Sequence, residues 1–229
     1  MFHVRDLGTA GVGVAFTSAA HNLSDLQDAS ARRTAFQHLS DAVGAPIAVV
    51  SQVHGCRVVE VTDGKRPIID TGEQADALIT SRTGLALAVR VADCIPILLT
   101  DAQAGWVAAV HAGRAGVLNG VVDATLEALT RRGASEIRAW LGPHICGRCY
   151  EVPDALASDF ADATGIAPAR TRWGTTGIDI GAAARAQLDA AGVGWSSYET
   201  CTFESPHLHS FRRDSERSGR TAGLIWLTR

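Results

Sequence analysis

The sequence predicts an α+β or mixed α/β fold, in which mixed β-sheets carry helices packed on their outer faces. Apolar runs of strand length and segments with helical spacing both occur along the chain, and they do not strictly alternate. The 229 residues contain neither an internal repeat nor a low-complexity linker. We therefore expect a single domain over residues 1–229, long enough to bury a substantial core.

Helices are expected where apolar residues recur every three or four positions and a glycine follows. Residues 26–43 show this spacing and end before Gly44. After Gly116 the same spacing runs from Leu118 to Leu129, and Arg131-Arg132-Gly133 forms a C-terminal stop. A shorter helix is expected in IGAAARAQLDAAGV, ending at Gly192.

Strands are expected in six apolar or alternating runs that are bounded by glycine, proline or a turn pair such as Asp63-Gly64. The runs are APIAVVSQVHG, GCRVVEVTDG, GLALAVRVADC, WVAAVHAG, EIRAWLGP and TAGLIWLT. Their mixture with helices gives the fold class stated above.

Charge and composition narrow the class of protein. A formal net charge of −3 without a basic stripe argues against a nucleic-acid partner, and no apolar run reaches the roughly 20 residues that cross a bilayer. MFHVRDLGTAGVGVAFTS lacks the basic start and continuous apolar core of a secretory signal. The five cysteines are an odd number and fit reduced thiols better than a disulfide framework. We expect a cytoplasmic protein that acts on a small molecule.

Three residues capable of binding a metal stand at the ends of expected strands: His54 in SQVHG, Cys94 in ADC and His111 in VHAG. Strand ends are where sites on sheet proteins usually form. Two histidines and one cysteine can hold zinc and leave a fourth position for water or substrate. The same residues also fit another chemistry, in which Cys94 is a thiolate nucleophile and a histidine is its base. Each residue could also be an ordinary core side chain.

Glycine-rich and cysteine-rich stretches offer further candidates. HAGRAG passes from a strand into a helix, so the amides from Gly113 to Gly116 with Arg114 could bind an anion, or simply form a tight turn. In CGRCYE, a redox or second-metal interpretation competes with a structural role for Cys146, which we favour. The residues that follow, Cys149, Tyr150 and Glu151, are then expected to line the pocket. In SPHLHSFRRD a solvated basic loop is favoured over a metal site at His207 and His209.

Several motifs together resemble one family, the YfiH-like proteins, also called laccase-domain or polyphenol-oxidase-like proteins and peptidoglycan editing factors. The motifs are QVHG (52–55), ADCIPILL (92–99), HAG (111–113), LGPHICGRCYEV (141–152) and FRRDSERSGR (211–220). HNLSD (21–25) is a faint echo of an N-terminal motif of the family. The resemblance implies a single α/β domain with a metal at His54, Cys94 and His111.

The resemblance also implies activities. Family members are described as zinc-dependent enzymes that cleave adenosine, inosine and methylthioadenosine with phosphate and deaminate adenosine. They are also described as copper-dependent phenol oxidases and as editors of cell-wall precursors. Eight histidines with one His-x-His pair are too few for the mononuclear and trinuclear centres of a multicopper oxidase. We expect a zinc enzyme of purine nucleosides, although copper can compete for such a site. The alternatives are an amidase-like precursor editor and a non-catalytic metal-binding protein.

Substrate contacts are expected around the metal ligands. Gly113 and Arg114 would hold phosphate, while Asp93 or Glu151 would move protons or bind ribose hydroxyls. Tyr150 and Arg212 complete the expected substrate-binding set. Two departures from the family affect this region. The family reads His-Ala-Gly-Trp-Arg-Gly where this chain has HAGRAG, and FTSAAHNLSD is shorter than the corresponding family segment and lacks its arginine and double glycine.

Overall fold

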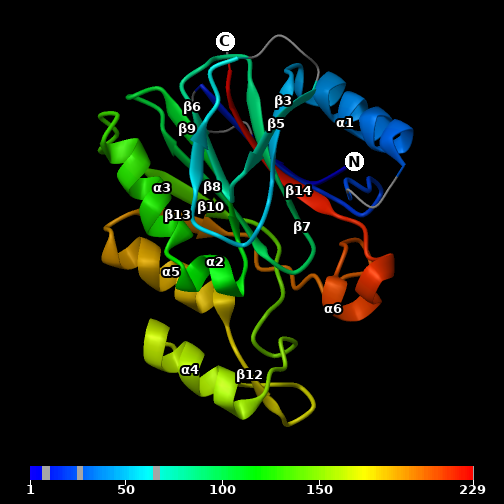
Figure 1. Ribbon diagram of the computed structural model, residues 1–229, viewed down its shortest axis with the longest axis vertical. Helices are drawn as coiled ribbons and strands as arrows, with labels where there is room; N and C mark the ends of the chain where they lie inside the picture. Colours follow the sequence, from blue (N-terminus) through cyan, green and yellow to red (C-terminus); the bar gives the residue numbers. More distant parts are fainter. Residues whose placement is uncertain (7–10, 25–27, 64–67, 229) are drawn as a thin grey trace.

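The computed structural model describes residues 1–6, 11–24, 28–63 and 68–228, and it places two mixed β-sheets face to face (Figure 1). The first sheet has the order β1 (Phe2–Asp6), β2 (Val12–Thr17), β14 (Thr221–Leu227), β7 (Ala86–Val91), β3 (Ile47–Ser51) and β5 (Ile68–Gln74). The second has the order β13 (Gly194–Ser197), β10 (Arg138–Leu141), β8 (Ile95–Asp101), β9 (Trp106–Ala112), β6 (Ala77–Thr80) and β4 (Val58–Glu60). Each sheet contains parallel and antiparallel pairs, as predicted.

Three apolar layers hold the sheets and helices together. Between the two sheets, Phe16 and Leu87 of the first sheet pack with Leu98 of the second. Helix α1 (Ala29–Val43) covers the outer face of the first sheet through Phe36 and Leu39. Full burial of such a side chain stabilises the fold by about 1.5–3 kcal/mol. Because each sheet has an apolar outer face, each requires a helical layer.

The outer face of the second sheet is covered by helices from later in the chain. These are α3 (Val121–Thr130), α5 (Ile180–Ala190) and α4 (Asp154–Thr164), whose apolar residues share one core cluster with β8 and β9. Figure 1 shows α1 and the α3–α5 pair on opposite sides of the sheets. The predicted architecture, with helices outside mixed sheets, is therefore confirmed. No helix among the described residues combines the length and apolarity that a membrane span requires.

The predicted helix after Gly116 is wrong in its extent. The chain forms the short helix α2 (Arg114–Leu118), stops at Asn119, and begins α3 at Val121. Gly120 separates the two with φ of 77°, a left-handed conformation that glycine adopts without steric cost. Apolar spacing continues through the break and conceals it. The glycine-rich turn therefore leads into a helix of five residues and not into a long one.

The other helices and strands were either predicted from the sequence or missed. Helix α1 ends at Gly44, which has φ of 72°, as its glycine signal predicts, and its predicted start at Leu26 lies outside the described residues. The helix predicted near residue 180 is α5, and the six predicted strands correspond to β3, β4, β7, β9, β10 and β14. Helix α4 and six of the strands given above were not predicted, namely β1, β2, β5, β6, β8 and β13. The Gly64 half of the predicted turn is outside the described residues.

The remaining elements are a small two-stranded sheet, which lies beside α4, and a short helix before β14. A two-stranded sheet joins β11 (Ala169–Arg170) and β12 (Thr176–Gly177), and α6 (Phe211–Asp214) is followed by a 3-10 turn over Ser215–Arg217. Three connections, β3 to β4, β5 to β6 and β7 to β8, carry the chain from the first sheet to the second. These connections hold His54 and Cys94.

Candidate metal centre

The three expected ligands come together. His54 lies in the connection from β3 to β4, Cys94 in the turn from β7 to β8, and His111 within β9. One ligand atom from each lies within 4.8 Å of the other two. The Cys94 Sγ is 3.7 Å from the His54 Nε2, and the two imidazole rings are 4.7 Å apart at 73° to each other. This two-nitrogen, one-sulfur set fits zinc or copper.

Cys94 is not at the end of the strand in which it was expected. Strand β7 ends at Val91, and Cys94 immediately precedes β8. Strand β8 pairs with β9 so that Pro96 lies opposite His111. Neighbouring strands therefore set the relative positions of the thiol and one imidazole, while the connection after β3 supplies His54.

A buried carboxylate organises the histidines. Asp76, fully buried just before β6, has its Oδ1 2.8 Å from the His111 Nδ1. It also accepts amide hydrogen bonds from Val53 (3.2 Å), His54 (2.9 Å) and Gly55 (2.7 Å). The contact engages one ring nitrogen of His111 and leaves the other for a metal. Asp76 was not predicted. The only signal was a lone acidic residue at the start of the apolar run ADALIT.

The same contacts set the charges at the site. Burial raises the pKa of the Cys94 thiol, but the charge of His111 and hydrogen bonds from both histidines outweigh it and bring the pKa to about 6. Burial lowers the pKa of His111, while the Cys94 charge and the Asp76 hydrogen bond raise it, to about 9. For Asp76, burial raises the pKa, and the bonds from His111 and the amides lower it to a net value below the ordinary one. Cys94 and His111 therefore each favour the charged form of the other.

Two residues at the site have left-handed backbone. His54 has φ of 62° and Asp93 has φ of 87°, a region that costs a non-glycine residue of order 1–3 kcal/mol. The amides around His54 are held by the Asp76 carboxylate, and the Asp93 carbonyl accepts from the Ile145 amide at 3.0 Å. The surrounding hydrogen bonds thus maintain the strained conformation that turns His54 and Cys94 toward each other.

Gly113 keeps the space above the cluster open. A Cβ atom at this position would lie 2.8 Å from the Cys94 Sγ and 2.8 Å from the His54 Cδ2, closer than side-chain atoms approach one another. The position has φ of −82°, so its glycine is required by space and not by backbone conformation. This gives Gly113 a role different from the predicted phosphate contact.

The cluster opens on a cavity of about 720 Å³. All three candidate ligands line it, with Asp93, Ile145 and Ile180. Its wall also contains four arginines and two aromatic rings, namely Arg90, Arg114, Arg212, Arg220, Tyr150 and Phe211. Sequence reasoning missed Arg90, Phe211 and Arg220, which come from distant segments. Basic and aromatic groups in one cavity suit a ligand that carries both negative charge and an apolar ring.

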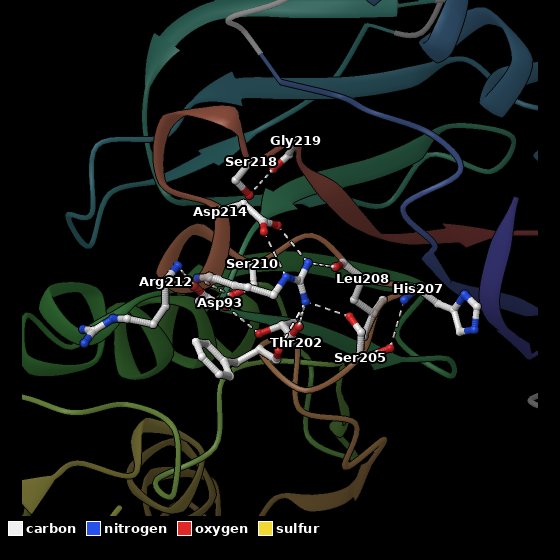
Figure 2. A network of polar contacts seen from close by, with 12 residues as sticks. Asp93, Thr202, Ser205, His207, Leu208, Ser210, Arg212, Asp214, Ser218 and Gly219 are labelled. Carbon is white, nitrogen blue, oxygen red and sulfur yellow. Dashed lines mark hydrogen bonds and ion pairs between the residues drawn. The ribbon is translucent and has the colours of Figure 1, made fainter. Parts of the chain in front are cut away.

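The predicted substrate residues Asp93 and Arg212 line the cavity and are also joined by a hydrogen bond. Figure 2 shows the Asp93 carboxylate between Thr202, whose hydroxyl donates at 2.6 Å, and the backbone amide of Arg212, which donates at 2.6 Å. The Arg212 guanidinium donates to the Glu151 carbonyl at 2.7 Å and lies 5.0 Å from the centre of the Tyr150 ring. Asp93 thus anchors α6 beside the metal cluster.

Of the other predicted substrate residues, Arg114 and Tyr150 line the cavity and Glu151 does not. Burial and the Cys94 charge raise the pKa of Tyr150, and the positive charges of Arg114 and Arg212 act against them. The phenol is therefore protonated at neutral pH. Glu151 has an exposed side chain and contributes its carbonyl to Arg212.

One expectation for the cysteine motif is wrong, because Cys149 is buried in the core and does not line the cavity. The basic segment after His207 is exposed, as expected. Within it, the Arg213 guanidinium also donates to the carbonyls of Thr202, Ser205 and Leu208 at 2.8–3.0 Å. His207 and His209 belong to neither group of possible metal ligands found among the described residues.

The shortened N-terminal segment still reaches the cavity. Asn22 of HNLSD accepts the amide of Arg220 through its Oδ1 at 3.0 Å, and Ser24 lines the cavity. Asp25, the last residue of that motif, lies outside the described residues.

Residues 4–228 match the model of the family described as multi-copper polyphenol oxidoreductase laccase. A Streptomyces coelicolor protein named purine nucleoside phosphorylase is 43% identical over 188 residues, which is 80% of this chain and 76% of that protein. A Corynebacterium glutamicum protein of the same name is 42% identical over 91% of this chain and 87% of its own length. A prokaryotic protein named adenosine deaminase RL5 is 38% identical over 74% of this chain and 71% of its own length.

Solved structures show the same fold. A Neisseria meningitidis protein superimposes with a TM-score of 0.84 and 30% identity, covering 100% of this chain and 99% of its own. YlmD from Geobacillus stearothermophilus gives a TM-score of 0.84 with 26% identity, over 96% and 93% of the two chains. The arrangement of sheets and helices described above is therefore shared by these proteins.

Proposed function

We propose that this chain is a metal-dependent enzyme of purine nucleosides. The chain belongs to the multi-copper polyphenol oxidoreductase laccase family, as its YfiH-like motifs predicted. The proposed reaction is phosphorolysis of adenosine, inosine or methylthioadenosine. The observation that carries the proposal is the His54, Cys94 and His111 cluster opening on a cavity with both arginines and aromatic rings. The names of the Streptomyces and Corynebacterium relatives support the substrate class.

The donor set fits a zinc ion, with His54, Cys94 and His111 as ligands. Zinc bound there would supply Lewis-acid chemistry and an activated nucleophile from water at neutral pH. Asp76 would keep His111 oriented through its 2.8 Å contact, and Gly113 would leave room for the reacting atoms. Copper can occupy the same donors, so the family description agrees with the site without requiring a multicopper centre.

The cavity wall supplies what phosphorolysis requires of the protein. A phosphate oxygen forms a bond to C1′ of the ribose while the bond from C1′ to the base breaks and the base takes up a proton. Arg114, Arg212 and Arg220 can bind the phosphate, and Tyr150 and Phe211 can pack against the purine. Protonated Tyr150 can donate a hydrogen bond to the substrate. These assignments replace the predicted anion site on amides 113–116, because α2 has only five residues.

Deamination of adenosine is the second proposed activity. Water adds to C6 of the purine and ammonia leaves, which gives inosine. The relative named adenosine deaminase RL5 favours this reaction. Both reactions take the same nucleoside as substrate, so the same pocket can serve both. We propose a cytoplasmic, small-molecule role consistent with these substrates.

The test is product analysis by chromatography after incubating purified protein with adenosine, with and without phosphate. The expected products are adenine and ribose 1-phosphate only when phosphate is present, together with inosine in either condition. The Cys94→Ser variant is expected to form neither, and Cys56→Ser, which alters an exposed thiol, keeps both activities. Turnover that survives in Cys94→Ser contradicts the site assignment.

Failure with every nucleoside contradicts the proposed function, and three alternatives then have distinct signatures. Cleavage of a cell-wall precursor would identify an editing amidase. Copper-dependent oxygen uptake with a phenol would identify an oxidase. Stoichiometric metal without turnover of any of these compounds would identify a metal-binding protein.

A further inference from the structure

A second group of thiols lies outside the cavity. Cys146 and Cys149 stand in the turn after β10, and Cys201 follows β13. Their three sulfur atoms lie within 4.8 Å of one another, although more than 50 residues separate Cys201 from the other two. All three are free thiols, and none lines the cavity beside His54 and Cys94. The cluster is therefore separate from the candidate metal centre described above.

A carboxylate completes the group. The Glu204 Oε1 is 3.5 Å from the Cys149 Sγ, and the Cys146 amide donates to the Cys201 Sγ at 3.4 Å. Amide donation to sulfur is the contact that stabilises a thiolate once its proton has left. The side chains of Arg148 and Arg172 approach Glu204 at 3.6 and 3.4 Å and keep the carboxylate beside the cluster.

This donor set has the size and chemistry of a structural zinc site. Zinc takes four ligands in a tetrahedron from cysteine sulfur, histidine nitrogen and carboxylate oxygen. A zinc–sulfur bond of about 2.3 Å places sulfurs about 3.8 Å apart, so the three thiols need to move together by about 1 Å or less. A disulfide would use two of the three thiols and leave the third, with Glu204, unexplained.

We propose that Cys146, Cys149, Cys201 and Glu204 bind a structural zinc ion, in addition to the metal at His54, Cys94 and His111. The ion would join the turn that carries Tyr150 to the segment that carries Thr202. Thr202 donates to Asp93, as Figure 2 shows. Arg213 donates to the carbonyls of Thr202 and Ser205. The zinc would thus fix one wall of the cavity without contacting substrate.

The first experiment counts zinc in the purified full-length protein by plasma mass spectrometry. We expect two zinc ions per wild-type chain, and one in either Cys146→Ser or Cys94→Ser. Glu204→Gln is expected to weaken the second zinc about 10-fold or more, because it removes the carboxylate charge. Cys56→Ser is the matched control and is expected to keep both ions, since Cys56 is exposed and outside both clusters.

A zinc count that Cys146→Ser leaves unchanged overturns the second site. The zinc count is independent of turnover, so loss of nucleoside activity with two ions bound would contradict the proposed function and leave the second site standing. The reverse result is a wild type that turns over nucleosides and holds one zinc ion, which Cys94→Ser loses and Cys146→Ser keeps. This result would contradict the second site alone.

Alkylation of the wild-type protein covers the case in which the variants do not fold. Cys146, Cys149 and Cys201 are expected to resist a thiol reagent until a chelator is added, whereas Cys56 reacts at once. Mass spectrometry of peptides reads each thiol separately. Equal protection with and without chelator, or a disulfide within the cluster of freshly purified protein, overturns the proposal.

Discussion

Two cysteine-containing clusters in this molecule have similar donor atoms and opposite surroundings. At His54, Cys94 and His111, a buried carboxylate and a large cavity adjoin the ligands, and the pKa of Cys94 falls to about 6. At the other cluster, burial and the neighbouring thiols raise the pKa of Cys149 well above its ordinary value. Imidazoles beside a cavity favour a charged, reactive thiolate, whereas closely packed thiols stay neutral until a metal displaces their protons. The comparison separates an open, reactive centre from a closed, structural one.

The largest expected effect comes from Cys94→Ser, which removes the central ligand of the open cluster. We expect metal at that cluster to be lost and nucleoside turnover to fall by more than about 100-fold, because even indirect changes to metal ligands cost 10–100-fold. Metal content and initial rates measure the two losses. Turnover near that of the Cys56→Ser control would contradict the conclusion that the open cluster, and not the thiol cluster, is the reactive one.

The next effect concerns Asp76→Asn. The asparagine keeps the shape of the side chain. Its NH₂ group, however, is a donor, and it would face the backbone amides and the histidine ring that donate to the carboxylate of Asp76. We expect zinc affinity at the open cluster to fall about 10–100-fold and the free energy of unfolding to fall by about 1–3 kcal/mol. A competition titration and denaturant unfolding measure these changes. Asp162→Asn, an exposed change on α4, is the control, and equal behaviour of the two variants contradicts a positioning role for Asp76.

A smaller effect is expected from Gly113→Ala. The added methyl lies 2.8 Å from the Cys94 Sγ, so the thiol or the His54 ring has to shift at a cost of about 1–3 kcal/mol. We expect metal affinity to fall about 10-fold with little change in secondary structure by circular dichroism. Gly194→Ala meets no atom within 4 Å and serves as the matched control. Wild-type affinity in Gly113→Ala would show that the space above the cluster is unimportant.

The smallest effect is a pH dependence of the metal-free protein. The lowered pKa of Cys94 contributes stability that is lost as pH falls from 9.0 toward about 6, and the raised pKa of His111 contributes stability that is lost as pH rises from 6.5 through about 9. The two slopes oppose each other, so this pair is expected to add little pH dependence between pH 6.5 and 9. Thiolate absorbance should nevertheless show a midpoint near pH 6 for Cys94 that rises in His111→Ala. A midpoint near the ordinary thiol value, unchanged in His111→Ala, would contradict the pairing.

The sequence predicts the candidate metal ligands better than their surroundings. His54, Cys94 and His111 stand in short motifs beside strands, and the family resemblance groups them. Asp76 could not be found in this way, because its partners are amides and a ring that come near only after β6, β9 and the β3–β4 connection assemble. A carboxylate before an apolar strand looks the same whether it is a surface residue or a buried acceptor.

The fold class and six of the strands follow from local pattern, whereas breaks and contacts between distant segments do not. Gly120 interrupts a continuous apolar spacing, so α2 and α3 appear as one helix in the sequence. Helix α4 was missed because only Ala157 and Phe160 of its residues are buried, which leaves a weak apolar stripe. The thiol cluster depends on tertiary packing that brings Cys201 to Cys146, and the Cys-x-x-Cys spacing alone gave no reason to look for a third cysteine.

The most direct measurement is an anomalous difference map across the zinc absorption edge, from crystals of the full-length protein purified without chelator. We predict a peak bounded by the His54 Nε2, the Cys94 Sγ and the free ring nitrogen of His111, on the side that faces the cavity. The absence of a peak there, with His111 hydrogen-bonded to Asp76 and the cavity filled by water alone, would contradict the assignment of this cluster as the metal centre.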